Sequence, residues 1–188
     1  MQDKAKTKDI CSAKVRRGGG TIEGVKVGGV YEVVCKGPDG KIRWRDTIKN
    51  LITTAGLNKL LDETLAGSAY TAAWYIGLIS ATSYTTGPAA GDTMASHGGW
   101  AEDETYSGAA RPTTAWSAAS SGSKALSAAL DYSINGTTTI KGCFLADDST
   151  KGGATGVLYS AGLFTGGDKA VSSGDTLSVS YTATIAAA

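Results

Sequence analysis

The amino-acid sequence predicts a mainly β protein: an antiparallel β-sandwich or jelly-roll-like domain with one short α-helix and an extended N-terminal arm. Only 19% of the 188 residues are charged and 26 are glycine, a composition that favours short strands and many turns over long solvated helices. Apolar and polar residues alternate with period 2 through most of the chain, and convincing helical spacing occurs in one stretch only. A chain of this length suits one folded domain with a sizeable core.

The first 28 residues are expected to form an arm outside this domain. They are rich in lysine and contain Gly18-Gly19-Gly20, and only Val25 and Val27 favour a short strand. Because little apolar area offsets the entropy lost on ordering, the arm is either extended and solvated or folds onto a neighbouring molecule. The predicted division is therefore an arm at residues 1–28 and one β-rich domain at residues 29–188.

The domain is expected to begin with a β-hairpin. Pro38-Asp39-Gly40 has the composition of a tight turn, since proline restricts φ and glycine tolerates positive φ. Arg43 and Arg45 alternate with apolar positions and fall on the solvent face of the second strand. The apolar face of the hairpin consists of Tyr31, Val33, Cys35, Ile42, Trp44 and Ile48.

The period then changes, and this change predicts a helix at about residues 54–66. Thr53 or Thr54 can cap its start and Gly67 can end it. Four leucines recur at helical spacing, and we expect them to extend the core beside Trp44 and Ile48; they are Leu57, Leu60, Leu61 and Leu65.

Strands continue after the helix. The apolar run at residues 73–79 predicts a central strand buried on both faces, residues 80–98 form a long loop, and a further strand is expected at 113–118. Strands in the final third are expected near residues 126–134, 140–146, 157–164 and 176–185. Asn135-Gly136 is typical of a two-residue hairpin turn between the first two of these strands.

The last strand alternates most clearly. Leu177, Val179 and Tyr181 are expected to face the core. Its other face is a row of hydroxyl side chains that faces either solvent or a partner; the row is Thr176, Ser178, Ser180, Thr182 and Thr184.

Charge is distributed unevenly along the chain. Residues 1–50 contain 12 Lys and Arg against 6 Asp and Glu, whereas residues 51–188 contain 6 against 11. This asymmetry indicates either a basic surface that meets an acidic partner or an arm that stays solvated; aromatic residues are not interleaved with the cations, so a nucleic-acid partner is not expected. The candidate partner contacts are Lys14, Arg16, Arg17, Arg43 and Arg45.

The sequence contains little that predicts catalysis or metal binding. The single histidine, His97, lies in a loop without a nucleophile motif, and Asp147-Asp148 fits an ordinary turn better than a calcium loop. The run Glu102-Asp103-Glu104 is expected to be a solvated loop face. The cysteines, Cys11, Cys35 and Cys143, are too widely spaced for a redox or zinc motif. We therefore expect a protein that is not an enzyme and holds no cofactor or metal.

Aromatic residues leave one alternative open. Trp100, Tyr106 and Trp116 are candidate exposed aromatics that could form a stacking platform for sugars, whereas Trp74 is expected in the core. No run of 18 apolar residues occurs, and the N-terminus lacks the apolar segment of a secretory signal, so we expect no membrane association.

Five segments of the chain carry a resemblance to known proteins: DGKIRWRDTIKNLITTAGLNKLLD, WYIGLI, AAGDTMASHGGW, YSGAARP and INGTTTIKGCFLADDSTKGGATGVLYSAGLFTGGDKAVSSGDTLSVSYT. Through them, residues 39–184 resemble a group of small structural proteins of tailed bacteriophages. This resemblance implies a virion component without catalytic residues, most simply a head decoration (cement) protein that binds the major capsid protein as a homo-oligomer such as a trimer. Such a protein would be assembled into particles in the bacterial cytoplasm. The alternative is a tail-tip or tail-fibre module that recognises carbohydrate on the host surface.

Overall fold

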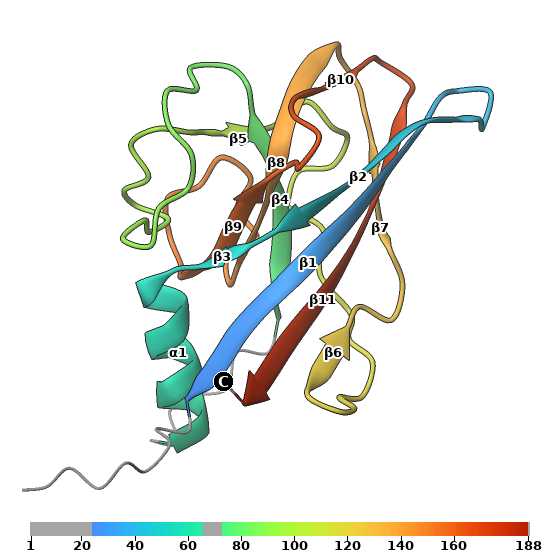
Figure 1. Cartoon of the computed structure of the whole chain (residues 1–188). Coiled ribbons are helices and arrows are strands. Elements are labelled where there is room, and N and C mark those ends of the chain that lie inside the picture. Colours follow the sequence, from blue (N-terminus) through green and yellow to red (C-terminus); the bar gives the residue numbers. More distant parts are fainter. Residues whose placement is uncertain (1–23, 66–72, 188) are drawn as a thin grey trace, which may run out of the picture.

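The chain folds into two antiparallel sheets that pack as a sandwich, with one helix beside them (Figure 1). This arrangement is seen in a computed structural model that describes residues 24–65 and 73–187. It confirms the predicted fold class, a mainly β, sandwich-like protein with a single helix among the described residues. No described helix is long and apolar enough to cross a membrane.

The first sheet has the order β2-β1-β11-β6, and β7 also pairs with β11. Its two longest strands, β1 and β11, pair along their whole length, from Val25 opposite Ala187 to Lys36 opposite Thr176. Its strands are β1 (Val25–Lys36), β2 (Ile42–Lys49), β6 (Ser123–Ala125), β7 (Leu130–Ser133) and β11 (Thr176–Ala187).

The second sheet has the order β3-β9-β8-β4-β5, and β10 also pairs with β8. The strand expected to be central, β4, lies between β8 and β5, and its residues from Ile76 to Ser80 are all buried, as predicted. The strands of this sheet are β3 (Leu51–Ile52), β4 (Tyr75–Ser80), β5 (Glu102–Asp103), β8 (Thr138–Ala146), β9 (Leu158–Leu163) and β10 (Lys169–Val171).

The N-terminal hairpin forms as expected, with Gly40 at a φ of 74° in its turn. Its first strand starts earlier than the predicted domain boundary, however. Residues 25–28 belong to β1, because each of them pairs with a residue at the end of β11. The part of the predicted arm at residues 1–23 lies outside the described residues.

Two sequence expectations in the middle of the chain are wrong. Asn135-Gly136 does not close a hairpin, because β7 pairs in the first sheet and β8 pairs in the second. A two-residue type I′ turn requires positive φ at both central residues, and neither residue has it. The chain instead crosses between sheets at this point, and the segment at 113–118 forms isolated bridges rather than a strand.

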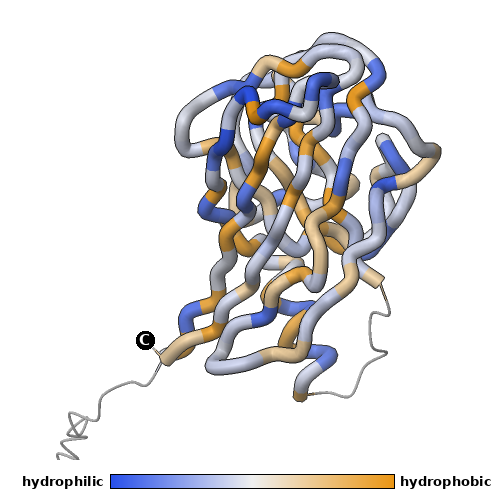
Figure 2. The backbone as a smooth tube through the Cα atoms, turned by 90° about the vertical axis from the view of Figure 1, so that its right-hand side faces the viewer, coloured by the Kyte–Doolittle hydropathy of each residue, from blue (hydrophilic) through white to orange (hydrophobic). Residues whose placement is uncertain are grey.

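The main core fills the space between the sheets with strand side chains. Tyr31, Val33 and Cys35 of β1 and Leu177, Val179 and Tyr181 of β11 are buried, so the alternation predicted for both strands is confirmed. In Figure 2 apolar and polar positions succeed each other along the strands, and much of the most hydrophilic chain lies in loops. A smaller cluster around Trp100, Phe144 and Met94 fills the space beneath the long loop.

The helix α1 (Thr54–Leu65) begins as predicted. Thr53 caps it, because its Oγ1 accepts a hydrogen bond from the Gly56 N–H at 3.0 Å. The expectation that four leucines extend the core is wrong: Leu57, Leu61 and Leu65 are exposed and Leu60 is half-buried. Strand side chains already fill the core, so the helix contacts β9 mainly through its one buried residue, Gly56.

We expect Gly56→Ala to lower the free energy of unfolding by about 1 to 3 kcal/mol, although alanine is the better helix former by about 1 kcal/mol. A Cβ at this position would lie 2.3 Å from the Tyr159 carbonyl oxygen, so the helix would have to move off β9. Urea unfolding followed by circular dichroism measures the change. Asn58→Ala, on the exposed side of the same helix, is the matched control and should not destabilise the protein.

Candidate functional site

Arg43, one of the candidate partner contacts, forms an ion pair within the chain. Its Nη1 lies 2.9 Å from Oδ2 of Asp175, a carboxylate that is 1% exposed. The same oxygen accepts the Ser172 N–H at 2.9 Å and faces the Cys35 thiol at 3.8 Å. Burial, followed by the charge of Asp175, raises the pKa of Cys35 to about 11. Arg43 therefore balances a buried charge, and its removal would affect folding as well as any surface.

Arg45 is exposed, as Arg43 is, but differs from Arg43 in having no hydrogen-bond or ion-pair partner among the described residues. It pairs with Val34 on β1, two positions from Thr47 and four from Lys49 on the same face of β2. Both Thr47 and Lys49 are exposed. The remaining basic candidates, Lys14, Arg16 and Arg17, lie outside the described residues.

Arg45 borders a broad face on the solvent side of the first sheet, which we call the outer face. On β11 it carries the row of hydroxyl side chains, which points away from the core as predicted. On β1 it carries Val30, Glu32 and Val34, which pair with Thr182, Ser180 and Ser178. Asp131 of β7 contacts this face through a hydrogen bond from Ser178 Oγ at 2.5 Å. The hydroxyl row on β11 is thus uncharged, whereas the other strands of the outer face carry charges of both signs: Lys26, Glu32 and Lys36 on β1, Asp131 on β7, and Arg45 and Lys49 on β2.

Two of the three candidate exposed aromatics are buried, so this expectation is wrong for them. Trp100 is 5% exposed, stacks on His97 with ring centroids 4.1 Å apart, and donates its indole N–H to Asp92 at 2.9 Å. Tyr106 is 1% exposed and packs edge-to-face on Tyr132. Burial, with the neighbouring Glu102 charge, raises the pKa of Tyr106.

Trp116 is the candidate aromatic that remains partly accessible. It is half-buried and packs edge-to-face against Tyr181, with ring centroids 5.9 Å apart. A bridge between Trp116 and Leu126 holds its backbone. Trp74, expected in the core, is also only half-buried and packs on Tyr159.

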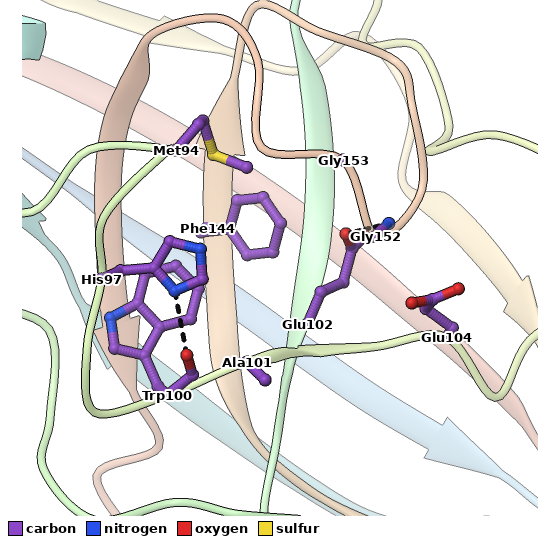
Figure 3. Close-up of a pocket in the computed structure, with 9 residues that line it drawn as sticks. All are labelled: Met94, His97, Trp100, Ala101, Glu102, Glu104, Phe144, Gly152 and Gly153. Atoms are coloured by element: carbon purple, nitrogen blue, oxygen red, sulfur yellow. Dashed lines mark hydrogen bonds between the residues drawn. The ribbon is translucent and has the colours of Figure 1, made fainter.

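His97 lines a small pocket of about 160 Å³ under the long loop (Figure 3). Its Nδ1 lies 2.9 Å from the Trp100 carbonyl oxygen, which requires an N–H at Nδ1 for a hydrogen bond. Trp100 and Phe144 form the apolar wall, and Glu102 lies across the pocket. None of the described lining residues is a serine, threonine or cysteine, so this pocket offers His97 no hydroxyl or thiol nucleophile.

The carboxylate of Glu102 is bound by the buried guanidinium of Arg111. Arg111 Nη2 lies 2.7 Å from Glu102 Oε2 and its Nε lies 3.0 Å from Oε1, a bidentate pair with side-chain exposures of 0% and 6%. Arg111 also donates to the carbonyl oxygens of Asp148 and Gly153, and the Gly152 N–H donates to Glu102. This cluster, which we call the Arg111 cluster, joins two loops and β5.

The Arg111 cluster was not recognised in the sequence. The run of residues 102–104 was expected to be a solvated loop face, but Glu102 and Asp103 are buried and only Glu104 is exposed. Asp103 accepts hydrogen bonds from Ser80 and Thr138. No periodicity connects residues nine apart in loops, so the sequence carries no local signal of this pairing.

The Asp147-Asp148 turn is held by hydrogen bonds, as its composition predicted. Asp148 accepts the Thr150 N–H at 2.7 Å and the Thr155 hydroxyl at 2.9 Å, and Asp147 accepts the Val157 N–H at 2.6 Å. Within residues 24–65 and 73–187, no group of three or more His, Cys, Asp or Glu side chains could hold a metal ion. The hydrogen bonds to the Asp148 carboxylate, first that from the Thr150 N–H and then that from Thr155, lower the pKa of Asp148.

The lowered pKa of Asp148 determines whether acid raises or lowers the stability of the fold. A carboxyl whose pKa is lower in the folded state stabilises the fold above its unfolded pKa of about 3.9, and that contribution is lost as pH falls through the folded pKa. Asp148→Asn should therefore lose stability at pH 6 but flatten the decline below about pH 4. Thermal unfolding from pH 6 to pH 2 measures both. Asp62→Asn, an exposed position on α1, is the control and should keep the wild-type profile.

No known family model matches the sequence, and no curated protein is similar to it.

Proposed function

We propose that the protein is a non-enzymatic structural protein of a bacteriophage particle, a head decoration protein that binds the major capsid protein and stabilises the shell. The observation that carries this proposal is the outer face of the first sheet, where a row of hydroxyl groups on β11 shares one surface with Arg45 of β2, a cation that has no partner among the described residues. The resemblance to phage structural proteins across residues 39–184 supports it, and implies assembly into particles in the bacterial cytoplasm.

The chemistry of the outer face suits docking onto a large assembled surface. Hydroxyl groups can form hydrogen bonds with a partner without the desolvation cost of buried charges. Arg45 and Lys49 at its border would direct association toward an acidic partner surface. Each copy needs only modest affinity if many copies bind an array of equivalent sites.

The state of the polar groups favours binding over catalysis. Glu102 is occupied by Arg111, Asp175 by Arg43, and Asp103 by two hydroxyl groups. His97 stacks on Trp100 and has no nucleophile among the described residues around it. The carbohydrate-binding alternative loses two of its three aromatic residues, because Trp100 and Tyr106 are buried and cannot stack on a sugar.

Cryo-electron microscopy of the particle tests the proposal. We expect density for this chain on the outside of the head, repeated over the shell, with the outer face toward the major capsid protein. Density only at the tail, or particles that lack the chain, would contradict the proposed function. Quantitative mass spectrometry gives an independent answer, because shell binding requires hundreds of copies per particle and a tail position about a dozen.

The same proposal includes self-association, for which the exposed leucines of α1 are the candidate contacts. Leu57, Leu61 and Leu65 follow one side of the helix and are 39%, 54% and 79% exposed. Contacts of this kind repeat symmetrically in a closed homo-oligomer such as a trimer. We expect light scattering to give an oligomeric mass for the wild type and a monomeric mass for Leu61→Glu. Asp62→Lys, an exposed change of charge about 100° around the same helix from Leu61, should keep the oligomer; a monomeric wild type would refute self-association.

A further inference from the structure

An apolar pocket of about 360 Å³ opens between α1 and the ends of β6 and β11. We call it the end pocket, since it lies where the long β1–β11 ribbon extends past the second sheet (Figure 1). Four aromatic rings line it, those of Trp74, Trp116, Tyr159 and Tyr181. Its aliphatic lining residues are Leu60, Ala119, Leu145, Ala183 and Ile185. Its volume falls in the range of pockets that bind small ligands or single anchoring groups.

The walls of the end pocket are held in place by contacts between the lining side chains and by hydrogen bonds from outside the pocket. Two edge-to-face pairs form them, Trp74 on Tyr159 and Trp116 on Tyr181. The Trp74 carbonyl oxygen accepts both the N–H and the hydroxyl of Thr114, at 2.8 and 2.9 Å. Since these four rings are already fixed by their neighbours, a ligand would find the pocket largely preformed.

Two features of the first sheet leave the pocket open. The row of core-facing residues on β11 is interrupted by the small side chain of Ala183, between Tyr181 and Ile185. Beyond that point Val27 pairs with Ile185 and Val25 pairs with Ala187, where the ribbon is exposed on its core-side face. The apolar surface therefore continues from the pocket along the ribbon. We call this strip, formed by Val25, Val27, Ile185 and Ala187, the track, since an extended chain could lie along it.

The rim of the end pocket has one cation without an acidic partner. Lys59 lies 3.5 Å from Glu63 and 3.3 Å from Asp147, so its charge is compensated. Lys124, on the opposite rim, donates to the Ser117 carbonyl oxygen at 2.9 Å and pairs with no carboxylate of the described chain. An occupant that places an anionic group near Lys124 would supply the counter-charge that this lysine lacks.

We propose that the end pocket binds an extended segment of a partner polypeptide, with one aromatic or large aliphatic side chain in the pocket and an acidic residue next to it, at Lys124. The track along the β1–β11 ribbon gives the rest of the segment an apolar surface. This site is separate from the outer face and does not depend on the proposed particle function. It can be tested on the isolated chain.

The first test uses the dye 1-anilinonaphthalene-8-sulfonate, which combines an apolar ring system with an anion. We expect one dye per native chain, excited by energy transfer from Trp74 and Trp116. Ala183→Leu on β11 and Ala119→Leu in the segment before β6 each fill the pocket and should weaken binding by about tenfold or more. Ala186→Leu, on the outer face of β11, is the matched control, and Leu61→Glu removes dye binding at the helix leucines as an explanation.

The second test identifies the occupant by displacement of the dye. N-acetyl-Asp-Trp-Leu-amide should displace it at concentrations about three- to fivefold lower than N-acetyl-Lys-Trp-Leu-amide, and Lys124→Gln should remove the difference. Native protein that binds no dye, or binding that survives both pocket-filling variants, would overturn the site. Stronger displacement by dodecanoate than by the acidic tripeptide would overturn the polypeptide as occupant and assign the pocket to a fatty acid.

Discussion

Replacing Arg111 with methionine is expected to lower the free energy of unfolding by about 3 to 5 kcal/mol, because it leaves the Glu102 carboxylate buried without a counter-charge. The substitution also removes two hydrogen bonds to the carbonyl oxygens of Asp148 and Gly153 and the contact of the guanidinium with the Phe144 ring. For a chain of this size the expected fall in melting temperature is about 6 to 20 °C. Differential scanning calorimetry measures it.

A second variant separates the buried charge from lost packing. In Arg111→Met combined with Glu102→Gln, the amide oxygen can still accept the Gly152 N–H but carries no charge, so about 1 to 3 kcal/mol should be recovered. Lys141→Met is the control for loss of an ion pair in general. Asp168, its partner, is 52% exposed, and the loss should stay within about 1 kcal/mol. Equal effects of Arg111→Met and Lys141→Met would refute a structural role for the Arg111 cluster.

Features set by local periodicity could be predicted from the sequence. The alternation of Leu177, Val179 and Tyr181 with hydroxyl residues required one face of β11 to be buried, and it is. Thr53 could be recognised as the helix cap because capping depends on residues three positions apart. The turn at Gly40 followed from the φ preferences of proline and glycine.

Features set by which elements meet could not be predicted. Helical spacing showed that Leu57, Leu61 and Leu65 lie on one side of α1. Whether that side is buried depends on whether strand side chains already fill the core, which the spacing does not show. Trp100 lies in a polar loop, and its burial comes from packing on Phe144 of β8. Ala183 could be assigned to the core face from its place in the alternation of β11. No local pattern indicated that a pocket would remain beside it.

The same distinction applies to the arginines of the hairpin. Arg43 and Arg45 occupy equivalent positions in the alternation of β2, and the sequence made both of them contact candidates. The structure separates them because Arg43 reaches Asp175, which is 132 residues away, and Arg45 does not. Removal of Arg43 would therefore leave the buried Asp175 carboxylate without its counter-charge, whereas removal of Arg45 would not.

Arg45→Glu is expected to weaken binding to shells of the major capsid protein by about tenfold or more, if the outer face is the docking surface of the proposed decoration protein. The reversed charge lies on β2, one strand away from the hydroxyl row on β11, where it would repel an acidic partner surface. Adding Lys49→Glu, on the same face of β2, should weaken binding further while thermal stability stays within about 0.5 kcal/mol of the wild type. Co-sedimentation with shells that lack the protein measures the affinity.

Lys41→Glu is the matched control, since it makes the same change of charge on the same hairpin but in the exposed turn beyond the sheet face. Its binding should resemble that of the wild type. Salt provides a second criterion, because screening reduces attraction between exposed charges: the affinity of the wild type should fall between about 0.05 and 0.3 M salt more steeply than that of Arg45→Glu. If Arg45→Glu and Lys41→Glu bind equally well at low salt, the cations of β2 do not contact the shell, and a different surface must carry the docking.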